Sequence, residues 1–597
     1  MPKASADAKE EGGEISSESP WESPIAACVP TLASVRDLRF MGDSFPIQTP
    51  RPVPNGTPCI PIDNAHIDAE LEAIYASTDF KLHAIDLLTG AIRIPTESHD
   101  NSGPVGEDPA WNIFADFHEY LERVFPLVYT KLDVTKINTY GLVHHWQGST
   151  EARYLTFVVG VSLNSPLDVV PVDPTTVSQW IHPPYSGHYD GTWIWGRGAC
   201  DDKSEIIERL IVVDSLLRRG FTPTRTLVIA LGFDEEAAGV QGASHIAKYL
   251  EETYGHNGFA MLVDEGPNGL VNFGDGFYFV SPKVSEKGYF DARVEVASPG
   301  GHSSIPPAHT SIGLLSLAIS AIEANPHSPE LPRNGTHFST IQCLADYSPS
   351  FPEELRNLAH RAVSDDRTLA RLEDALSELS PAMRAMMVTT QAVNVIKGGV
   401  KANALPERAS AVVNHRITEH SSVAELQQHL IDVLSPVAAS HELTLRAFGR
   451  VMKTGDSGKI IISNNSGIAL EPSPVTPVGY GPYSILTGTI KATITTSKLY
   501  NGTPIILGPS LSLGKYIDIS FFCSPLHNIN HGLISANTDT VWYWDLTKHI
   551  FRSSLVTKSD YYNGVHTVNE ALRADAYIEG IRFLTKLILN VDESPLS

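Results

Sequence analysis

The sequence predicts an α/β protein in which a larger domain, built on a mostly parallel sheet with flanking helices, is interrupted by an inserted α+β domain. Apolar strand-like runs alternate with helical patterns from about residue 150 to 285, which is typical of parallel sheets. A different mixture of strands and helices begins at residue 286. The chain has 597 residues, too many for a single hydrophobic core.

Changes of pattern along the chain predict four segments. Residues 1–60 are rich in Ser, Pro, Glu and Ala without periodicity, and we expect them to be disordered or irregular. The other expected segments are residues 61–285 as the first part of the larger domain, 286–445 as the inserted domain, and 446–597 as the second part of the larger domain.

Local patterns predict the elements within these segments. Helical periodicity opens the larger domain at residues 63–88. The inserted domain is expected to hold a strand at 286–298, a helix at 312–324, charged helices across 353–385 and a strand–turn–strand–helix unit near 393–435.

Composition excludes some classes of function. The 44 basic residues against 68 acidic ones give a net charge of −24, which argues against a nucleic-acid partner because phosphate binding needs basic patches. No run of about 18 apolar residues is present, so no transmembrane segment is expected. The N-terminus also lacks the basic and apolar regions of a signal peptide.

The most informative feature is a set of acidic residues at the ends of apolar strands. The stretch GRGACDDK at 196–203 delivers Asp201, and the expected strand at 225–233 runs into Glu235 and Glu236. A second expected strand, within 259–266, ends on Asp264 and Glu265, and a third, at 167–173, opens near Asp168. Ligands bind at the carboxyl ends of strands in open α/β sheets.

A lone acidic triplet at a strand end is more often a solvated surface feature than a ligand set. Several strands that each start or end on a carboxylate favour a metal site, and His566 in GVHTVNE adds an imidazole. Carboxylate and imidazole ligands suit Zn²⁺, and a neighbouring glutamate outside the ligand set can act as a general base.

The chain resembles the M20 family of metallopeptidases, and within it the fungal carboxypeptidase S branch. The matching stretches run in the family's order from about residue 85 to the C-terminus, and they include IRIPTES, LDVVPVDPTT, GRGACDDK, DEEAAGVQGA, FAMLVDEG, SEKGYFD, PGGHSS, NALPERA and HTVNEAL. The resemblance implies a zinc-exopeptidase-like domain with an inserted lid, or dimerisation-type, domain.

The resemblance also implies roles for individual residues in a two-zinc site. Asp201 resembles the carboxylate that bridges both zinc ions, Glu235 the general base and Glu236 a ligand beside it. His566 resembles the last ligand, and either Asp264 or Glu265, with Asp264 favoured, a further one.

Other residues are implied to act around the metals. Asp168 resembles an acid that orients a metal-bound histidine. His302 resembles the donor to the developing oxyanion, Arg416 the residue that binds a substrate carboxylate, and Asn403 is expected beside Arg416. The spacing of Arg416 fits an ordinary salt-bridged strand residue about equally well.

The sequence departs from the family where a histidine ligand should stand. The family motif is His-x-Asp, but this chain reads Pro166-Leu167-Asp168, so one zinc site is expected to be impaired. Four other histidines, His144, His145, His182 and His188, fall where the family places no ligand. A second departure lies at residues 514–534.

Two interpretations of these departures remain open. In the first interpretation, both departures are translated from retained intron or mis-joined exon sequence, and reading the transcript across both junctions would test it. In the second, the chain is a genuine metal-poor pseudoenzyme.

The leading function implied is zinc-dependent release of C-terminal residues from short peptides with a free carboxylate. The alternative within hydrolases is an N-acyl-amino-acid amidohydrolase, which uses the same metals. The resemblance further implies a vacuolar location and allows a homodimer.

Overall fold

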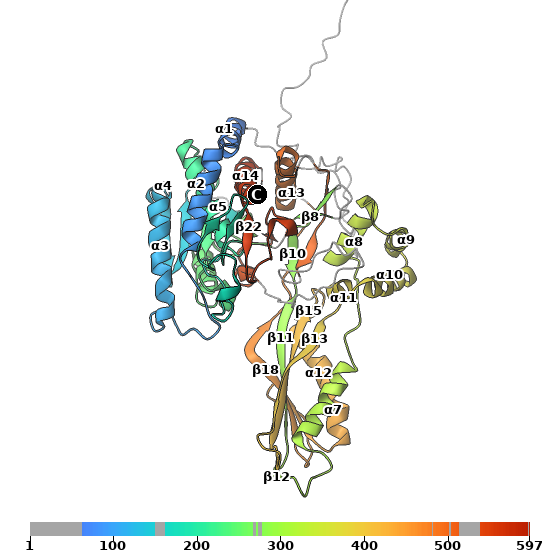
Figure 1. The fold of residues 1–597 in the computed structure, drawn as a ribbon. Helices are drawn as coiled ribbons and strands as arrows, with labels where there is room; N and C mark the ends of the chain where they lie inside the picture. Colours follow the sequence, from blue (N-terminus) through green and yellow to red (C-terminus); the bar gives the residue numbers. More distant parts are fainter. Residues whose placement is uncertain are drawn as a thin grey trace, which may run out of the picture.

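The computed structural model describes residues 63–149, 161–266, 270–272, 277–479, 481–500, 503–512, 538–594 and 596. The expectations for residues 1–60 and 514–534 therefore fall outside the described residues. The chain forms a broad domain and a narrow second domain that extends from it and ends near β12 (Gly301–His302) (Figure 1).

The broad domain is built on an eight-stranded sheet of order β1-β2-β6-β3-β7-β21-β10-β20. Its centre is parallel, because β6, β3, β7 and β21 pair in that sense. The pairs β1–β2, β2–β6 and β10–β21 are antiparallel, and β10–β20 is parallel. The strands are β1 (Asp133–Ile137), β2 (Gly141–Trp146), β3 (Val161–Asn164), β6 (Leu227–Leu231), β7 (Met261–Asp264), β10 (Lys283–Glu286), β20 (Ser510–Ser512) and β21 (Ile550–Arg552).

The expected strands at 225–233 and 259–266 are confirmed as β6 and β7. The strand expected at 167–173 is wrong, because β3 ends at Asn164 and only Val169 makes an isolated bridge, to Glu97. Pro166 lacks the N–H that a strand would need at this point. The helical region expected at 63–88 is two helices, because Ser77 caps a new one.

Helices cover both faces of this sheet. Leu227, Ile229 and Leu231 of β6 point into a core shared with α2, α5, α13 and α14, whereas Val228 and Ala230 face a second core with α6. This alternation follows from the two-residue period of a strand. The helices are α1 (Ala65–Tyr75), α2 (Thr78–Ile92), α3 (Ile113–Val124), α4 (Pro126–Lys131), α5 (Lys203–Arg218), α6 (Ala243–Tyr254), α13 (Pro482–Thr496) and α14 (Ala574–Glu593). No described helix combines the length and apolar character needed to cross a membrane.

The second domain, called the lid below, has a six-stranded sheet of order β13-β15-β11-β18-β16-β17 with α7 and α12 on one face (Figure 1). β18 ends at Leu470 and pairs with β11, so the lid sheet continues past the boundary expected at residue 445. Its elements are β11 (Gly288–Ala297), α7 (Ser311–Glu323), β13 (Thr390–Gly398), β15 (Arg408–Ile417), α12 (Val423–Ser440), β16 (Thr444–Ala447), β17 (Arg450–Lys453) and β18 (Lys459–Leu470).

Four helices between α7 and β13 form a separate helical unit with its own apolar core. This core includes Phe279 and Ile506 from the broad domain. The unit therefore packs against a small sheet of β8 (Leu270–Asn272), β9 (Tyr278–Val280) and β19 (Ile505–Leu507). The helices are α8 (Thr336–Tyr347), α9 (Glu353–Ala362), α10 (Asp366–Leu379) and α11 (Pro381–Met387).

Candidate metal centre and active site

Three side chains from distant parts of the chain converge on one point. Nε2 of His566 lies 2.9 Å from Oδ2 of Asp201 and 2.8 Å from Oε1 of Glu236. All three ligand atoms lie within 4.8 Å of one another, and they form the one such group of three or more potential ligands in the described part of the chain. The structure thus brings together three of the residues that the resemblance implied to be metal ligands.

Each of these residues follows a strand or a tight turn. Glu235 and Glu236 form a short 3-10 turn (Glu235–Ala237) just after β6. Asp201 follows β5 (Trp193–Trp195) through a turn in which Gly198 has φ +82°, and a Cβ there would lie 2.7 Å from Val169. Glycine is therefore required to bring the backbone this close.

His566 has φ +59°, a left-handed conformation that is uncommon for a residue with a side chain. It lies in the loop that precedes β22 (Ala571–Arg573). Such outliers persist where the surroundings fix them, and here both carboxylates contact the imidazole.

The electrostatics favour a cation at this point. Burial lowers the pKa of His566, but hydrogen bonds to Asp201 and Glu236 outweigh that effect and raise it to about 9. The same two carboxylates would attract a divalent ion in place of the proton. Two carboxylates and one imidazole are a donor set that fits zinc, so the residues present fit the expected metal.

Asp168 is buried and holds the turn that carries Glu235 and Glu236. Its Oδ1 accepts the backbone N–H of Glu235 at 3.1 Å, and its Oδ2 accepts the backbone N–H of Glu236 at 3.1 Å and the hydroxyl of Ser98 at 2.5 Å. Burial, followed by the charge of Glu236, raises the pKa of Asp168 to about 7. Asp168 thus orients the Glu235–Glu236 turn, whereas the resemblance implied a histidine.

Asp264 and Glu265 lie at the end of β7, both buried, and do not belong to the group of three. Burial raises the pKa of Asp264 to about 7, against the lowering effect of Arg552 and Arg209. Oδ2 of Asp264 has no hydrogen-bond partner among the described residues. Their expected part in a second metal position stays a prediction.

Pro166, two positions before Asp168, is buried. Its side chain has no atom that could bind a metal in place of the expected histidine. None of the four alternative histidines joins the metal group of the described residues. His144 is fully buried in β2, and burial lowers its pKa to about 4. His182 and His188 stack on each other, with ring centroids 4.0 Å apart.

The lid residues are divided between its two ends. His302 is exposed in β12, which pairs with β14 (Ala404–Leu405) at the end of the lid far from the sheet (Figure 1). Asn403 lies there too, since its carbonyl accepts the N–H of Ser303. Arg416 lies at the other end of β15, opposite Tyr289. The expectation that Asn403 lies beside Arg416 is therefore wrong within one chain, because β15 separates them.

Comparison with known proteins agrees with this geometry. Residues 163–485 match the model of peptidase family M20/M25/M40. Carboxypeptidase S of Saccharomyces cerevisiae is 34% identical over 529 residues, which cover 88% of this chain and 86% of that protein. The chain belongs to the M20 peptidase family.

Other relatives place the chain more widely within this family of metal-dependent hydrolases. An N-fatty-acyl-amino acid synthase/hydrolase of Mus musculus is 29% identical and covers 85% of this chain and 87% of that one. In fold, the chain resembles human carnosine dipeptidase 1, with a TM-score of 0.53, 15% identity and coverage of 89% and 100%. It also resembles an M20 family metallo-carboxypeptidase of Sulfolobus solfataricus, with a TM-score of 0.52, 17% identity and coverage of 85% and 99%.

The structure adds residues that sequence reasoning did not single out. Ser98 and Glu570 lie within the matching stretches IRIPTES and HTVNEAL, and Arg197 lies within GRGACDDK. The motifs flagged these positions, but only the contacts show that Ser98 bonds to Asp168 and that Glu570 contacts the Asp201 loop.

Proposed function

We propose that this M20 family member is a zinc carboxypeptidase that releases C-terminal residues from short peptides. The observation that carries the proposal is the meeting of Asp201, Glu236 and His566 next to Glu235. The similarity to carboxypeptidase S supports the same reaction. Zinc is proposed as the metal because of the mixed carboxylate and imidazole donors.

Zinc, when bound by Asp201, Glu236 and His566, supplies Lewis acidity that polarises a carbonyl and lowers the pKa of water towards about 7. Glu235 is the proposed general base, which takes a proton from the attacking water and passes it to the leaving amine. Asp168 keeps Glu235 in place through its backbone N–H.

Arg416 is proposed to bind the substrate's free carboxylate. Its guanidinium carbon lies 4.3 Å from the centre of the Tyr289 ring, within the range of a cation–π contact. Burial lowers the pKa of Arg416 to about 10, but the group stays charged near neutral pH. A planar guanidinium forms two parallel bonds to a carboxylate.

The proline at position 166 reduces the expected metal affinity. A complete zinc site in a zinc-finger peptide is worth on the order of 10–16 kcal/mol, so one ligand of four contributes about 3–4 kcal/mol. This loss corresponds to two to three powers of ten in affinity, at about 1.4 kcal/mol per decade. We therefore propose one zinc held firmly, the other weakly, and reduced activity in this chain.

The test compares this protein with a Pro166→His variant by zinc content and by hydrolysis of an N-blocked dipeptide. We expect about one zinc per chain at first, and a rise in both zinc and hydrolysis with the histidine. Adding Glu235→Gln should keep the zinc but lower the rate by roughly 10²–10⁴-fold. If neither protein binds zinc, the metallopeptidase proposal fails and the metal-poor alternative stands.

We further propose that a second copy of the chain completes the site. Arg408, near the far end of the lid, lies eight residue steps along β15 from Arg416, which corresponds to roughly 26 Å. His302 and Asn403 therefore serve another copy. β13 is an edge strand of the lid sheet, with Ile396 60% exposed, and an open edge readily pairs with another strand.

Mixed dimers test this proposal in the Pro166→His background. Glu235→Gln and His302→Ala chains should each be nearly inactive alone. When refolded together, about half of the dimers are mixed and carry one intact site of two, so about a quarter of the parent activity should return. A mixture that stays as inactive as its components would contradict the shared site.

A second candidate reaction is hydrolysis of N-acyl amino acids, because a relative with 29% identity is an N-fatty-acyl-amino acid synthase/hydrolase. Both substrate classes present an amide bond next to a free carboxylate, which Arg416 would bind in either case. A faster rate on an N-fatty-acyl amino acid than on an N-blocked dipeptide would favour this candidate. The vacuole is the proposed location, and imaging of a tagged full-length chain in the source cells tests it.

A further inference from the structure

Glu570 joins two segments that carry metal ligands. It follows His566 by four residues and directly precedes β22, which pairs with β5 through Ala571 and Trp195. The pairing continues beyond both strands, because the N–H of Gly196 donates to the carbonyl of Glu570 at 3.0 Å. The backbone therefore aligns the end of the His566 loop with the start of the Asp201 loop.

The side chain of Glu570 then grips the Asp201 loop itself. Oε1 accepts the backbone N–H of Gly198 at 3.0 Å and that of Cys200 at 2.9 Å. Cys200 is the residue directly before Asp201. A charged acceptor with two backbone donors makes hydrogen bonds about twice as strong as neutral ones.

The other carboxylate oxygen of Glu570 connects to the His566 loop through Arg197. Oε2 of Glu570 forms an ion pair with Nη1 of Arg197, and this nitrogen also lies 3.4 Å from the carbonyl of Thr567, next to His566. Glu570 and Arg197 are both buried. A fully buried ion pair is costly to form, and in this place it serves to fix two loops against each other.

We infer that Glu570 is a positioning residue that sets the separation of Asp201 and His566, and hence the affinity of the metal centre. Its carboxylate hydrogen-bonds to the backbone of Gly198 and Cys200, and it positions Asp201 through that backbone. The inference rests on the proposed zinc site. Groups that hold metal ligands in place typically contribute 10–100-fold to metal affinity.

The test is Glu570→Gln, with zinc affinity measured by competition with a chelating dye. The glutamine oxygen can still accept both backbone N–H groups, but its amide then faces the donors of Arg197. We expect zinc to bind 10–100-fold more weakly. Hydrogen exchange should also speed up at Gly198 and Cys200, which reports the loop directly.

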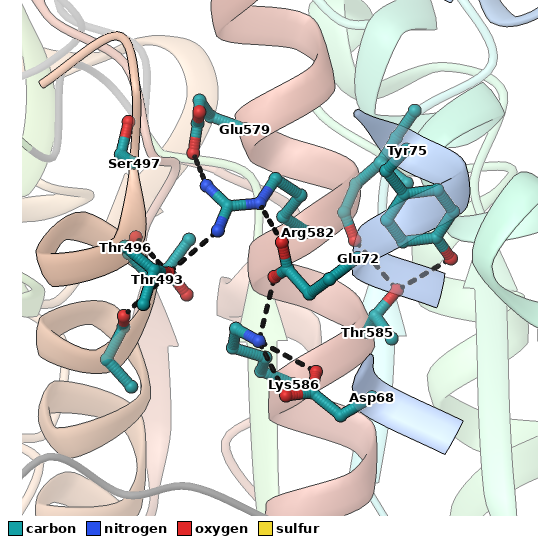
Figure 2. Close-up of polar contacts among 12 residues, drawn as sticks. Asp68, Glu72, Tyr75, Thr493, Thr496, Ser497, Glu579, Arg582, Thr585 and Lys586 are labelled. Carbon is teal, nitrogen blue, oxygen red and sulfur yellow. Dashed lines mark hydrogen bonds and ion pairs between the residues drawn. The ribbon is translucent and has the colours of Figure 1, made fainter. Parts of the chain in front are cut away.

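The matched control is Glu579→Gln. Glu579 is also buried and also paired with an arginine, Arg582, but this pair lies within α14 and is joined to Glu72 of α1 (Figure 2). It should lower the thermal midpoint while zinc affinity stays within twofold of the parent. Equal zinc affinity in both variants, with unchanged exchange at Gly198 and Cys200, would overturn the inference.

Two outcomes need separate readouts. If the parent itself binds no zinc, the metal proposal fails, and hydrogen exchange in the Asp201 and His566 loops alone decides the role of Glu570. If Glu570→Gln does not fold, Glu570→Asp keeps the charge but is one methylene too short to reach both Cys200 and Arg197. It should then lower zinc affinity, and parent-like affinity in that variant would overturn the inference.

Discussion

Asp168 shows how a residue can keep a positioning task after its expected partner is lost. With Pro166 in the histidine position, its two oxygens bond to the backbone N–H groups of Glu235 and Glu236 and to the hydroxyl of Ser98. An acceptor that is buried and fully used is costly to remove. The turn that carries Glu235, the proposed base, and Glu236, a proposed ligand, is therefore held independently of position 166. For this reason, restoring a single histidine is expected to restore the proposed site.

At the scale of elements, a buried ionic network ties α1 to α14. Nζ of Lys586 in α14 lies 2.7 Å from both carboxylate oxygens of Asp68 and 2.8 Å from Oε1 of Glu72, both in α1 (Figure 2). Arg582 of α14 contacts Glu72 at 2.7 Å and Thr496 of α13 at 2.7 Å. Lys586 and Arg582 thus join α14 to both α1 and α13.

Lys586→Met should destabilise this junction strongly. The change removes the cation and leaves Asp68, which is buried, without its ion-pair partner. Breaking a buried pair from one side costs roughly 3–5 kcal/mol. Urea unfolding followed by far-UV circular dichroism would measure the loss.

The control for this prediction is Lys81→Met, which breaks an ion pair between α2 and Asp575 of α14. Asp575 has 58% of its side chain exposed, and surface pairs contribute about 0–1 kcal/mol. Losses of equal size in the two variants would contradict the importance of the buried network.

Sequence patterns predicted the elements better than their contacts. The apolar runs that became β6 and β7 and the periodic segment that became α7 could be recognised because each is set by local sequence. The position of Asn403 relative to Arg416 could not, because it depends on the register of β15 in the lid sheet. The end of the lid at Leu470 was missed for the same reason, since β18 is held there by pairing with β11.

For the candidate metal centre too, the sequence predicted the residues but not their contacts. Motifs from the family resemblance named Asp201, Glu236 and His566, which the structure brings together. They could not show that Asp168 bonds to the turn after β6, or that Glu570 bonds to the loop after β5. These contacts join residues far apart in the chain, and no spacing rule encodes them.

At the scale of the whole molecule, the broad domain, the lid sheet and the helical unit meet at Lys287. This residue alone separates β10 from β11, and its buried Nζ donates to the carbonyls of Ala385 and Val388 at the end of α11. His337 of α8 is buried close by, and burial followed by the charge of Lys287 lowers its pKa to about 3. The junction therefore contains an imidazole that must stay neutral.

This neutral imidazole predicts sensitivity of the junction to acid. In the unfolded chain, histidine has a pKa near 6.5. Below that pH, His337 is therefore protonated in the unfolded chain but stays neutral in the folded protein. The free energy of unfolding linked to His337 is at its full value above about pH 6.5 and falls by about 1.4 kcal/mol per pH unit as the pH drops towards the pKa of folded His337.

His337→Leu should remove this dependence. The stability of this variant relative to the parent should therefore rise by about 2 kcal/mol when the pH is lowered from 7 to 5. Urea unfolding of both proteins at the two pH values measures the difference, with His83→Leu as the control for removing an exposed histidine. A gap between His337→Leu and the parent that is the same at both pH values would show that the junction tolerates a charged imidazole.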